Sequence, residues 1–467
     1  MNVPVTFVER AHKGIGHSST AAGEVGARRM MSHRIAAGAD YPAMEEMRDQ
    51  ARRIRLYSLG HLDELLGRFS DEIEGAGGFV HFAADADEAI AHIRRIADEK
   101  NVRRIVKSKS MVTEEIRLNA ALEAHGLEVV ETDLGEFIVQ LSGDRPSHII
   151  APVMHKTRQE VGELFHDKLG IEYTDDPTEL NNAARNHLRE IFLSADMGIS
   201  GCNVAIAESG SVVLVTNEGN GRLTTSAPRI HVAVMGLERI VPTLSDAAVI
   251  LEVLARSATG QRLSVYTNFV TGARRPGDPD GPEEFHVVIL DNGRSRVLAG
   301  DTAEILACIR CGACLNVCPV YREAGGHAYG FTYSGPIGAV ITPSLMGMAE
   351  WHDLPYASSL CGACLDACPV RIDLPGLLLK LRRDAVRDGF GPDGLERALK
   401  WFTRLATNPP MWRGATRAGG WGAKLIARRG WIKSLPGRGS AWTDHRDLPA
   451  PAAKPFHARW EERRREA

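Results

Sequence analysis

The chain has 467 residues, a formal net charge of −3 and a hydrophobic content of 44%, which describe about two to four ordinary globular domains. This charge gives no reason to expect binding to nucleic acid or acidic lipid. The N-terminal stretch lacks a signal peptide, and no apolar run approaches the roughly 18–20 residues of a membrane helix. We therefore expect a cytoplasmic protein without a transmembrane segment, although peripheral docking on a membrane stays compatible with the sequence.

The first half of the chain predicts a helical start followed by an α/β unit. Residues 1–45 are polar, rich in glycine and alanine, and weakly periodic, which favours a mobile N-terminal arm. Residues 41–78 show the apolar spacing of one or two amphipathic helices. Short strands then alternate with helices, which predicts βαβ units and a mainly parallel sheet. The expected strands are "GFVHFA", "RRIVKSKS", "LEVVETD" and "SHIIAP".

After residue 200 the pattern changes. The run "CNVAIAESGSVVLVTNEGNG" is typical of two strands joined at Ser209 and Gly210 as a hairpin. A strand, the helix "LSDAAVILEVLARSATG" and a last strand, "FHVVILDNGRS", complete one α/β unit over residues 46–298. The final part of the chain is basic and holds six of the seven tryptophans, which we expect to anchor an irregular C-terminal region.

Four cysteines are crowded into the stretch "CIRCGACLNVCPVY". Cys308, Cys311, Cys314 and Cys318, followed by a proline, have the spacing of a bacterial ferredoxin motif. Closely spaced cysteines on a tight loop can direct three thiolates at one iron–sulfur cluster, while the proline turns the fourth away. In proteins with two clusters, that fourth cysteine ligates the other cluster.

A second motif, "SSLCGACLDACPV", supplies the partners. By the crossing rule, Cys368 completes a first site with Cys308, Cys311 and Cys314. The second site then contains Cys318, Cys361 and Cys364, and a fourth cysteine is missing because Ser358 stands at its position. Three thiolates suit a three-iron cluster, or a four-iron cluster whose last iron binds Ser358, water or a side chain such as His352. Zinc is the alternative metal, but seven cysteines in two proline-terminated motifs fit zinc poorly.

Weaker signals lie in the α/β unit. Ser108, Ser110, Lys107 and Lys109 stand before a helix and could hold a carboxylate or phosphate, or could be ordinary capping and solvated residues. Glu208, beside glycine turns, could act as an acid, a base or a nucleophile. His155, Lys156 and Arg158 fit a solvated face better than an anion contact, and Cys202 is expected to be a free buried thiol. There is no Rossmann fingerprint.

Long stretches of the chain resemble one known family and occur in the same order. They are "KSKSMVTEEIRLNAALEAHGLEVVETDLGEFIVQL", "PSHIIAPVMHK", "FLSADMGISGCNVAIAESGSVVLVTNEGNGR", "CIRCGACLNVCPVYR", "LPYASSLCGACLDACPV" and "AWTDHRDLPAPAAKPFHARW". These stretches resemble the lactate utilization iron–sulfur protein B family, also called LutB, LldF or YkgF. The resemblance implies an α/β LUD domain similar to the sugar-phosphate isomerase and CoA-transferase folds. A mainly helical ferredoxin-like domain with two [4Fe-4S] clusters would follow.

The resemblance also implies a division of the chain and a role. We expect an arm (1–45), the LUD domain (46–298), the iron–sulfur domain (299–390) and a C-terminal region of the family (391–467). The family implies electron transfer in the oxidation of L-lactate to pyruvate, with LutA-like and LutC-like partners. This role would make the chain a non-catalytic component of a larger enzyme system. The alternative is that the LUD domain itself holds the catalytic site for a small hydroxy acid, with the clusters as its electron relay.

Overall fold

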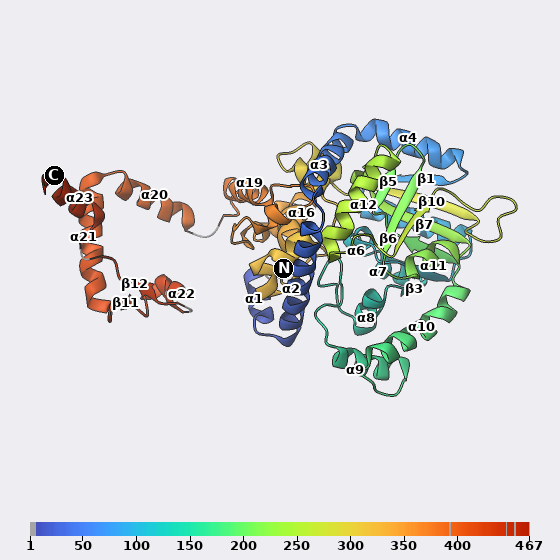
Figure 1. The fold of residues 1–467 in the computed structure, drawn as a ribbon, viewed down its shortest axis with the longest axis horizontal. Helices are drawn as coiled ribbons and strands as arrows, with labels where there is room; N and C mark the ends of the chain where they lie inside the picture. The colour runs from blue at the N-terminus through green and yellow to red at the C-terminus, as the bar shows by residue number, and fades with distance from the viewer. Residues whose placement is uncertain (1–5, 392–393, 445, 453, 467) are drawn as a thin grey trace. The chain divides into compact units, whose positions relative to one another are not determined.

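The computed structural model describes residues 6–391, 394–444, 446–452 and 454–466 (Figure 1). It divides into two compact units, and the boundary in the chain falls between Phe390 and Gly391. The first unit contains the α/β fold and all eight cysteines, and the second contains the C-terminal region. Each unit is described by itself below.

A six-stranded parallel sheet forms the centre of the first unit. Its order is β1-β10-β7-β4-β2-β3, and every neighbouring pair is parallel, as the alternating pattern predicts. The central strand β7 is buried along its whole length, which explains its continuous apolar sequence. The strands are β1 (Phe79–Ala83), β2 (Arg104–Lys107), β3 (Glu128–Glu131), β4 (Met197–Ser200), β7 (Ile230–Gly236) and β10 (Glu284–Leu290).

Helices α5 (Ala86–Glu99), α6 (Met111–Glu115) and α7 (Leu118–Ala124) cover one face of this sheet. The apolar residues of α5 occur at helical spacing and are buried against the strands. The connection after β2 consists of two short helices, α6 and α7, because Arg117 adopts a left-handed φ of 52° between them. Three more helices pack together into a separate cluster: α8 (Leu134–Ser142), α9 (Arg158–Leu169) and α10 (Pro177–Ser194).

A smaller sheet and α12 (Leu244–Thr259) lie on the opposite face. The sheet has the order β8-β5-β6-β9, and β5 pairs with β6 in antiparallel fashion, which confirms the predicted hairpin. Its strands, and the helix that follows β6, are β5 (Val204–Ile206), β6 (Ser211–Thr216), β8 (Ile240–Val241), β9 (Tyr266–Val270) and α11 (Asn220–Ser226). The core on this face continues without interruption into the cysteine-rich part of the chain.

Residues 7–14 and 18–39 form helices that pack on the rest of the unit, so the expectation of a mobile arm is wrong for the described residues, and residues 1–5 of that arm lie outside them. Helix α1 (Phe7–Gly14) buries Phe7 and Ala11, and α2 (Ser18–Ala39) packs against α12 and the cysteine-rich helices. Helix α2 is rich in alanine and glycine and has almost no apolar periodicity, so its sequence carried no helical signal. The predicted amphipathic helices follow as α3 (Met44–Gly60) and α4 (Leu62–Gly75).

The stretch "SHIIAP", expected as a strand, is a tight loop. Ser147 donates its backbone N–H to the carbonyl of Pro152, and His148 Nδ1 accepts the N–H groups of Ile150 and Ala151. A histidine side chain therefore replaces the hydrogen bonds of a neighbouring strand. On its other side, His148 Nε2 lies 3.1 Å from the Asn316 side chain, which joins this loop to the cysteine motif.

The cysteine-rich part is built from short helices that wrap around the two motifs. These are α13 (Arg294–Leu298), η2 (Ala303–Ala307), α14 (Ala313–Val317), α15 (Pro319–Ala324), η3 (Gly326–Tyr329), α16 (Gly335–Met346), α17 (Met348–Trp351), η4 (Leu354–Tyr356), α18 (Ala363–Ala367) and α19 (Leu374–Arg387). Helices α14 and α18, one from each motif, pack against each other.

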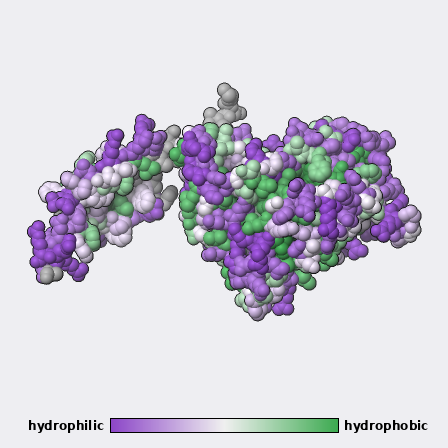
Figure 2. Space-filling view, turned by 90° about the horizontal axis from the view of Figure 1, so that it is seen from above, coloured by the Kyte–Doolittle hydropathy of each residue, from purple (hydrophilic) through white to green (hydrophobic). Residues whose placement is uncertain are grey.

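The C-terminal unit is more regular than the sequence predicts. It contains α20 (Leu395–Ala406), α21 (Pro409–Ile426), β11 (Trp431–Ile432), η5 (Gly437–Gly439), α22 (Ser440–Thr443), β12 (Leu448–Pro449) and α23 (Phe456–Glu466). Hydrophilic side chains cover most of the surface seen in Figure 2, and hydrophobic ones gather between them on the first unit. Within the residues that the structure describes, every helix is too short or too polar to cross a membrane.

Candidate iron–sulfur centre

The two cysteine motifs have the same backbone geometry. Arg310 and Leu360, at equivalent positions, have left-handed φ angles of 61° and 54°, and Gly312 and Gly362 follow with 73° and 85°. In each motif a one-turn helix begins directly after this glycine and is capped at its end by the last cysteine of the motif. The motifs are therefore structural repeats, and the glycine is needed because the φ angle is positive.

The repeat extends to the first position of each motif. The backbone N–H of Arg310 donates to Cys308 Sγ at 3.4 Å, and the N–H of Leu360 donates to Ser358 Oγ at 3.1 Å. Ser358 thus makes the hydrogen bond that Cys308 makes in the first motif. His352 is engaged elsewhere, because its ring stacks on Phe390 and its Nδ1 lies 3.2 Å from the carbonyl of Ala349.

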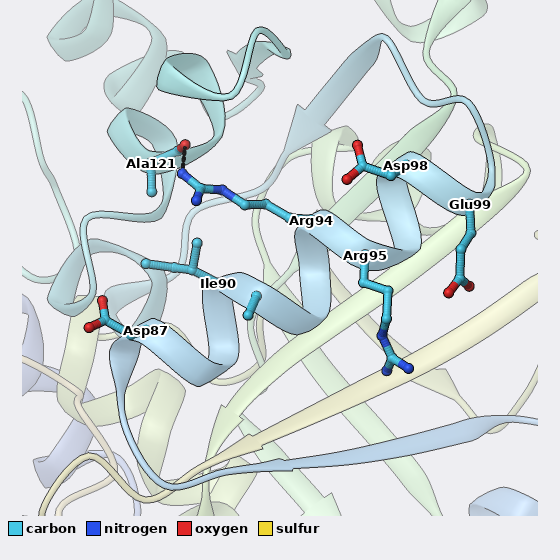
Figure 3. Close-up of a pocket in the computed structure, with 8 residues that line it drawn as sticks. Asp87, Ile90, Arg94, Arg95, Asp98, Glu99 and Ala121 are labelled. Carbon is cyan, nitrogen blue, oxygen red and sulfur yellow. Dashed lines mark hydrogen bonds between the residues drawn. The ribbon is translucent and has the colours of Figure 1, made fainter.

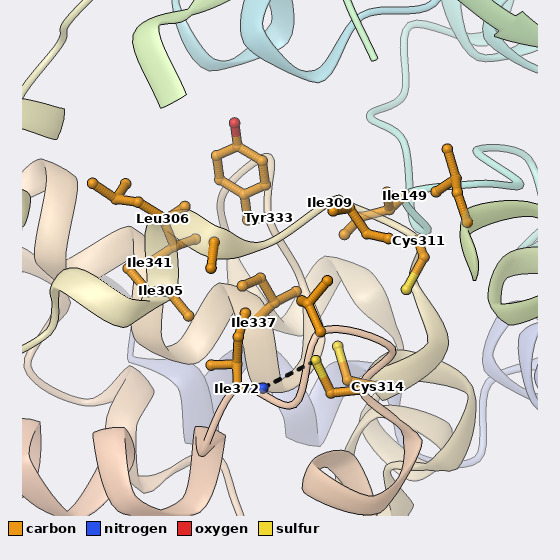
Figure 4. Packing of buried hydrophobic residues seen from close by; sticks show 14 of the residues in the cluster. Ile149, Ile305, Leu306, Ile309, Cys311, Cys314, Tyr333, Ile337, Ile341 and Ile372 are labelled. Carbon is orange, nitrogen blue, oxygen red and sulfur yellow. Dashed lines mark hydrogen bonds between the residues drawn. The ribbon is translucent and has the colours of Figure 1, made fainter. Parts of the chain in front are cut away.

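Four cysteines line one cavity, as the crossing rule predicts. They are Cys308, Cys311 and Cys314 of the first motif and Cys368 of the second. The other walls are mainly apolar, and Figure 4 shows Ile149, Ile309, Ile337 and Ile372 around Cys311 and Cys314. The structure therefore brings to one mainly apolar cavity the four cysteines that spacing assigns to one site.

The other three cysteines form a second group nearer the surface. Cys318 and Cys364 are buried, whereas Cys361 is exposed. Burial raises the pKa of Cys364 to about 12, with Cys318 and Cys361 adding to the shift. Burial also raises the pKa of Cys318, and the charge of Cys361 adds to this shift.

The residues present fit iron–sulfur clusters. Burial raises the pKa of Cys368 to about 11, although the N–H of Ile372 donates to its sulfur at 3.3 Å. Buried thiols with raised pKa values and amide N–H groups directed at sulfur are a site that metal binding would deprotonate and complete. Among the described residues, no three ligand-type side chains converge on a point where a single metal ion would sit. The cysteines of the first group instead line one cavity.

Positive charge surrounds the first group of cysteines. Arg48 donates to the carbonyl of Cys368 at 2.9 Å, and the charge of Arg34 interacts with Cys311. Arg310 lies between two cysteines and interacts with Cys308, which raises the pKa of its guanidinium against the effect of burial. Sequence reasoning missed Arg34 and Arg48, because they belong to helices distant in the chain and no motif marks them.

A buried ion network joins the sheet to the cysteine loops. Arg294, with no solvent exposure, binds both oxygens of Glu115 at 2.9 Å and lies 2.7 Å from Glu238. Burial alone would raise the pKa of Glu238, but Arg294 and its neighbours Arg239 and Arg310 lower it to about 2. Glu238 therefore stays ionised and connects the α/β core to Arg310 of the first motif.

Some of the residues that gave weaker sequence signals line a cavity, and others only make structural contacts. Ser108, Lys109 and Ser110 line a large cavity, and the glycine turn contributes Asn217, Glu218, Asn220 and Gly221 to the same cavity. Lys107 is buried in ion pairs with Glu131 and Glu114, at 2.7 and 3.2 Å, so it supports the fold and does not line this cavity. Cys202 also lines the cavity, and burial raises its pKa to about 12, as expected for an unreactive thiol.

Other candidates have structural roles. Glu208 accepts the backbone N–H of Leu244 at 2.6 Å, at the start of α12, and it does not line the large cavity. His155 and Lys156 both face Asp144, at 3.5 and 2.6 Å. A depression along α5 carries acidic and basic side chains side by side (Figure 3), and Arg94 donates to the carbonyl of Ala121. No cysteine lines that depression.

Comparisons with known proteins agree with this architecture. Residues 66–290 match the LUD domain, residues 304–372 match a 4Fe-4S dicluster domain, and residues 388–465 match the C-terminal domain of lactate utilisation protein B. Lactate utilization protein B of Geobacillus thermodenitrificans is 50% identical over 414 residues, which are 88% of this chain and 87% of that protein. The protein of the same name from Bacillus licheniformis is 47% identical over 94% of this chain and 92% of its own.

A third relative is described as an uncharacterized electron transport protein, YkgF, from Escherichia coli. It is 47% identical over 89% of this chain and 87% of its own. A crystal structure of a DUF162 family protein from Deinococcus radiodurans is 18% identical, covers 49% of this chain and 98% of its own, and has a TM-score of 0.28, too low to carry an argument.

The fold and the cysteine loops define an iron–sulfur protein with a LUD domain, a dicluster domain and a dedicated C-terminal domain. The chain belongs to the lactate utilization protein B family. It is therefore an iron–sulfur protein of lactate utilization.

Proposed function

We propose that this protein is the electron-transfer subunit of a system that oxidises L-lactate to pyruvate, working with LutA-like and LutC-like partners. Two [4Fe-4S] clusters, when bound, would accept and release single electrons. The observation that carries the proposal is the shared cavity in which Cys368 of the second motif joins three cysteines of the first. We also infer a cytoplasmic location, because free thiols persist in a reducing compartment.

The ligand sets follow from this crossing. Cys308, Cys311, Cys314 and Cys368 would hold the first cluster, and Cys318, Cys361 and Cys364 the second. Ser358 is our choice for the fourth ligand of the second cluster, because its hydroxyl occupies the place of Cys308 in the repeat. The three-iron alternative would leave Ser358 unligated.

The surroundings of the two sites suit different tasks. Apolar side chains around the first site exclude water, and Arg34, Arg48 and Arg310 offset its negative charge. At the second site Cys361 is exposed, which would let a partner protein approach the sulfurs closely. We therefore propose that partners exchange electrons with the chain at the second site. The division into LUD domain (46–298), iron–sulfur domain (299–390) and C-terminal region (391–467) remains part of this proposal.

The test is reduction by substrate. Protein purified without oxygen is mixed with its LutA-like and LutC-like partners and L-lactate, and electron paramagnetic resonance follows the clusters. Reduction that requires both lactate and the partners supports the proposal. Iron–sulfur centres that stay oxidised in the complete mixture, while dithionite reduces them, would contradict it.

A second candidate function makes the LUD domain itself catalytic for a small hydroxy acid. The sequence pointed to Glu208, which serves the start of α12 instead. What favours this candidate is the large cavity lined by Lys109 and Arg310, since Arg310 belongs to the first cysteine motif. Reduction of the clusters by L-lactate in the isolated chain, without partners, would support it over electron transfer alone.

A further inference from the structure

A cavity of about 500 Å³ lies in the α/β fold beside the cysteine loops. Ser108–Ser110, which directly follow β2, and Gly201–Asn203, which directly follow β4, line it. Strand β2 has β3 on one side and β4 on the other. The order of strands in the sheet therefore reverses between β2 and β4. The crevice at the carboxyl ends of the strands at such a switch point is where open α/β sheets bind ligands.

Three basic side chains in the wall of this cavity have unused donors. Among the described residues, no acceptor takes a hydrogen bond from Lys109 Nζ, from Arg239 Nε, or from Nε and Nη1 of Arg310. Arg239 and Arg310 are each only 6% exposed, and Ser108, at 5%, also has an unpartnered hydroxyl.

Carboxylates face these cations at longer range. Glu136 lies 3.7 Å from Lys109 Nζ, and Glu238 lies 3.8 Å from Arg239 Nε. Buried donors are normally satisfied, and leaving them unpaired costs free energy. The wall therefore offers donors that a bound anion could use.

The cavity also indicates which anion. Guanidinium groups and an ammonium group pair well with carboxylate or phosphate oxygens. However, Asp133 and Glu218 also line the cavity, and their charges disfavour a doubly charged phosphate. Ile138, Ile149 and Leu254 offer apolar contacts for the rest of the molecule. A singly charged organic acid with a short apolar part meets all three conditions.

The cavity shares a wall with the first cysteine site, since Arg310 and Ile149 line both. We infer that the cavity binds a small organic monocarboxylate, held by Lys109, Arg239 and Arg310 next to the first cluster. The choice of L-lactate or pyruvate as this acid rests on the proposed function.

This placement couples binding to electron transfer. A bound anion that shares Arg310 with the cysteine loop disfavours added negative charge there. The two equilibria are linked: the factor by which the bound anion favours the oxidised cluster equals the factor by which reduction of the cluster weakens anion binding. If Arg310 serves only to offset the charge of the cluster, the cavity will bind no anion.

The experiment titrates full-length, anaerobically purified protein of known iron content with L-lactate, pyruvate and inorganic phosphate by calorimetry. We expect L-lactate or pyruvate to bind once per chain, and phosphate to bind at least about tenfold more weakly. Lys109→Gln should weaken binding of the acid at least about tenfold, and Ser108→Ala about threefold or more.

Lys156→Gln is the matched control. Lys156 is 18% exposed against 17% for Lys109, is paired with a carboxylate, and does not line the cavity. The control should bind the acid as the unmodified chain does. Ser108→Ala removes only an unpartnered hydroxyl, so it provides a test even if Lys109→Gln fails to fold.

A second readout is the midpoint potential of the first cluster. Saturating pyruvate should make it more negative, by about 59 mV for each tenfold loss of affinity on one-electron reduction. The inference is overturned if iron-replete protein binds neither acid, if phosphate binds more tightly, or if Lys109→Gln and Lys156→Gln behave alike. If the anaerobically purified protein contained no iron but still bound the acid, the proposed electron-transfer function would be contradicted and the acid site would not.

Discussion

Ser358 would decide the chemistry of the proposed second cluster, because it stands where a fourth cysteine is missing. The two motifs are backbone repeats, and Ser358 Oγ accepts the N–H of Leu360 as Cys308 Sγ accepts the N–H of Arg310. A serine hydroxyl in the place of a thiolate is a harder ligand, so a cluster held there would differ electronically from the first one.

Ser358→Ala tests this assignment. If Ser358 binds iron, its loss should leave three thiolates and favour a three-iron cluster, so the iron content should fall by about one per chain. Electron paramagnetic resonance of the oxidised protein should then show a new three-iron signal. Ser359→Ala, at the exposed neighbouring position, is the control and should change nothing. Spectra of Ser358→Ala identical to those of the unmodified chain would exclude Ser358 as a ligand.

Glu136 makes the stability of the fold depend on pH. Burial raises the pKa of Glu136 to about 8 from 4.5, although Lys109 opposes the shift. Between these values the unfolded chain has lost the proton that the folded chain keeps, so stability falls as pH rises through this window. Glu136→Gln removes the penalty. Its thermal midpoint should exceed that of the unmodified protein at pH 8, and the gain should shrink towards pH 5.

Glu163→Gln, at an exposed position on α9, is the control for Glu136→Gln. It should shift the midpoint little and equally at both pH values. A gain from Glu136→Gln that is the same at pH 5 and pH 8 would show that Glu136 is not the group responsible.

At the scale of elements, the sequence predicts those helices, strands and turns that have a clear apolar period or characteristic turn residues. The parallel sheet, the hairpin at Ser209 and helix α5 were predictable because their apolar residues recur with the period of the element. Helix α2 was not, because alanine and glycine pack closely without an apolar stripe. The loop at 147–152 has the composition of a strand, but the His148 side chain satisfies its backbone.

The candidate site divides in the same way. Spacing predicts which cysteines share a site, because a local motif fixes the direction of each thiolate. The residues that surround them could not, because Arg34, Arg48 and Ile149 reach the cysteines only through tertiary packing. Lys109 and the glycine turn were recognised separately, but only the fold shows that they line one cavity.

The ion network between β-sheet and cysteine loops should be essential for folding. Arg294→Leu leaves Glu115 and Glu238 without their main buried partner, which we expect to cost about 3–5 kcal/mol. The control is Arg274→Leu, because Arg274 and Glu283 form an ion pair that is about half exposed and should contribute less than about 1 kcal/mol. Urea unfolding compares the two variants, and equal small losses would contradict a structural role for the network.

At the scale of the molecule, the LUD fold and the cysteine loops form one body. A continuous core runs from the small sheet to the helices around both motifs, and Arg310 faces the sheet network, the large cavity and the cysteine site. This continuity suggests why an α/β domain without a Rossmann fingerprint accompanies an iron–sulfur domain. It can hold an organic acid where binding and electron transfer influence each other.

The most direct test of the account compares Cys308→Ala, Cys368→Ala and Cys361→Ala by electron paramagnetic resonance after anaerobic purification. The unmodified chain should contain about eight irons and show two distinct clusters. Because the motifs exchange ligands, Cys368→Ala should lose the same cluster signal as Cys308→Ala, and Cys361→Ala should lose the other. If Cys368→Ala and Cys361→Ala lose the same signal, each motif holds its own cluster and the crossed arrangement is wrong.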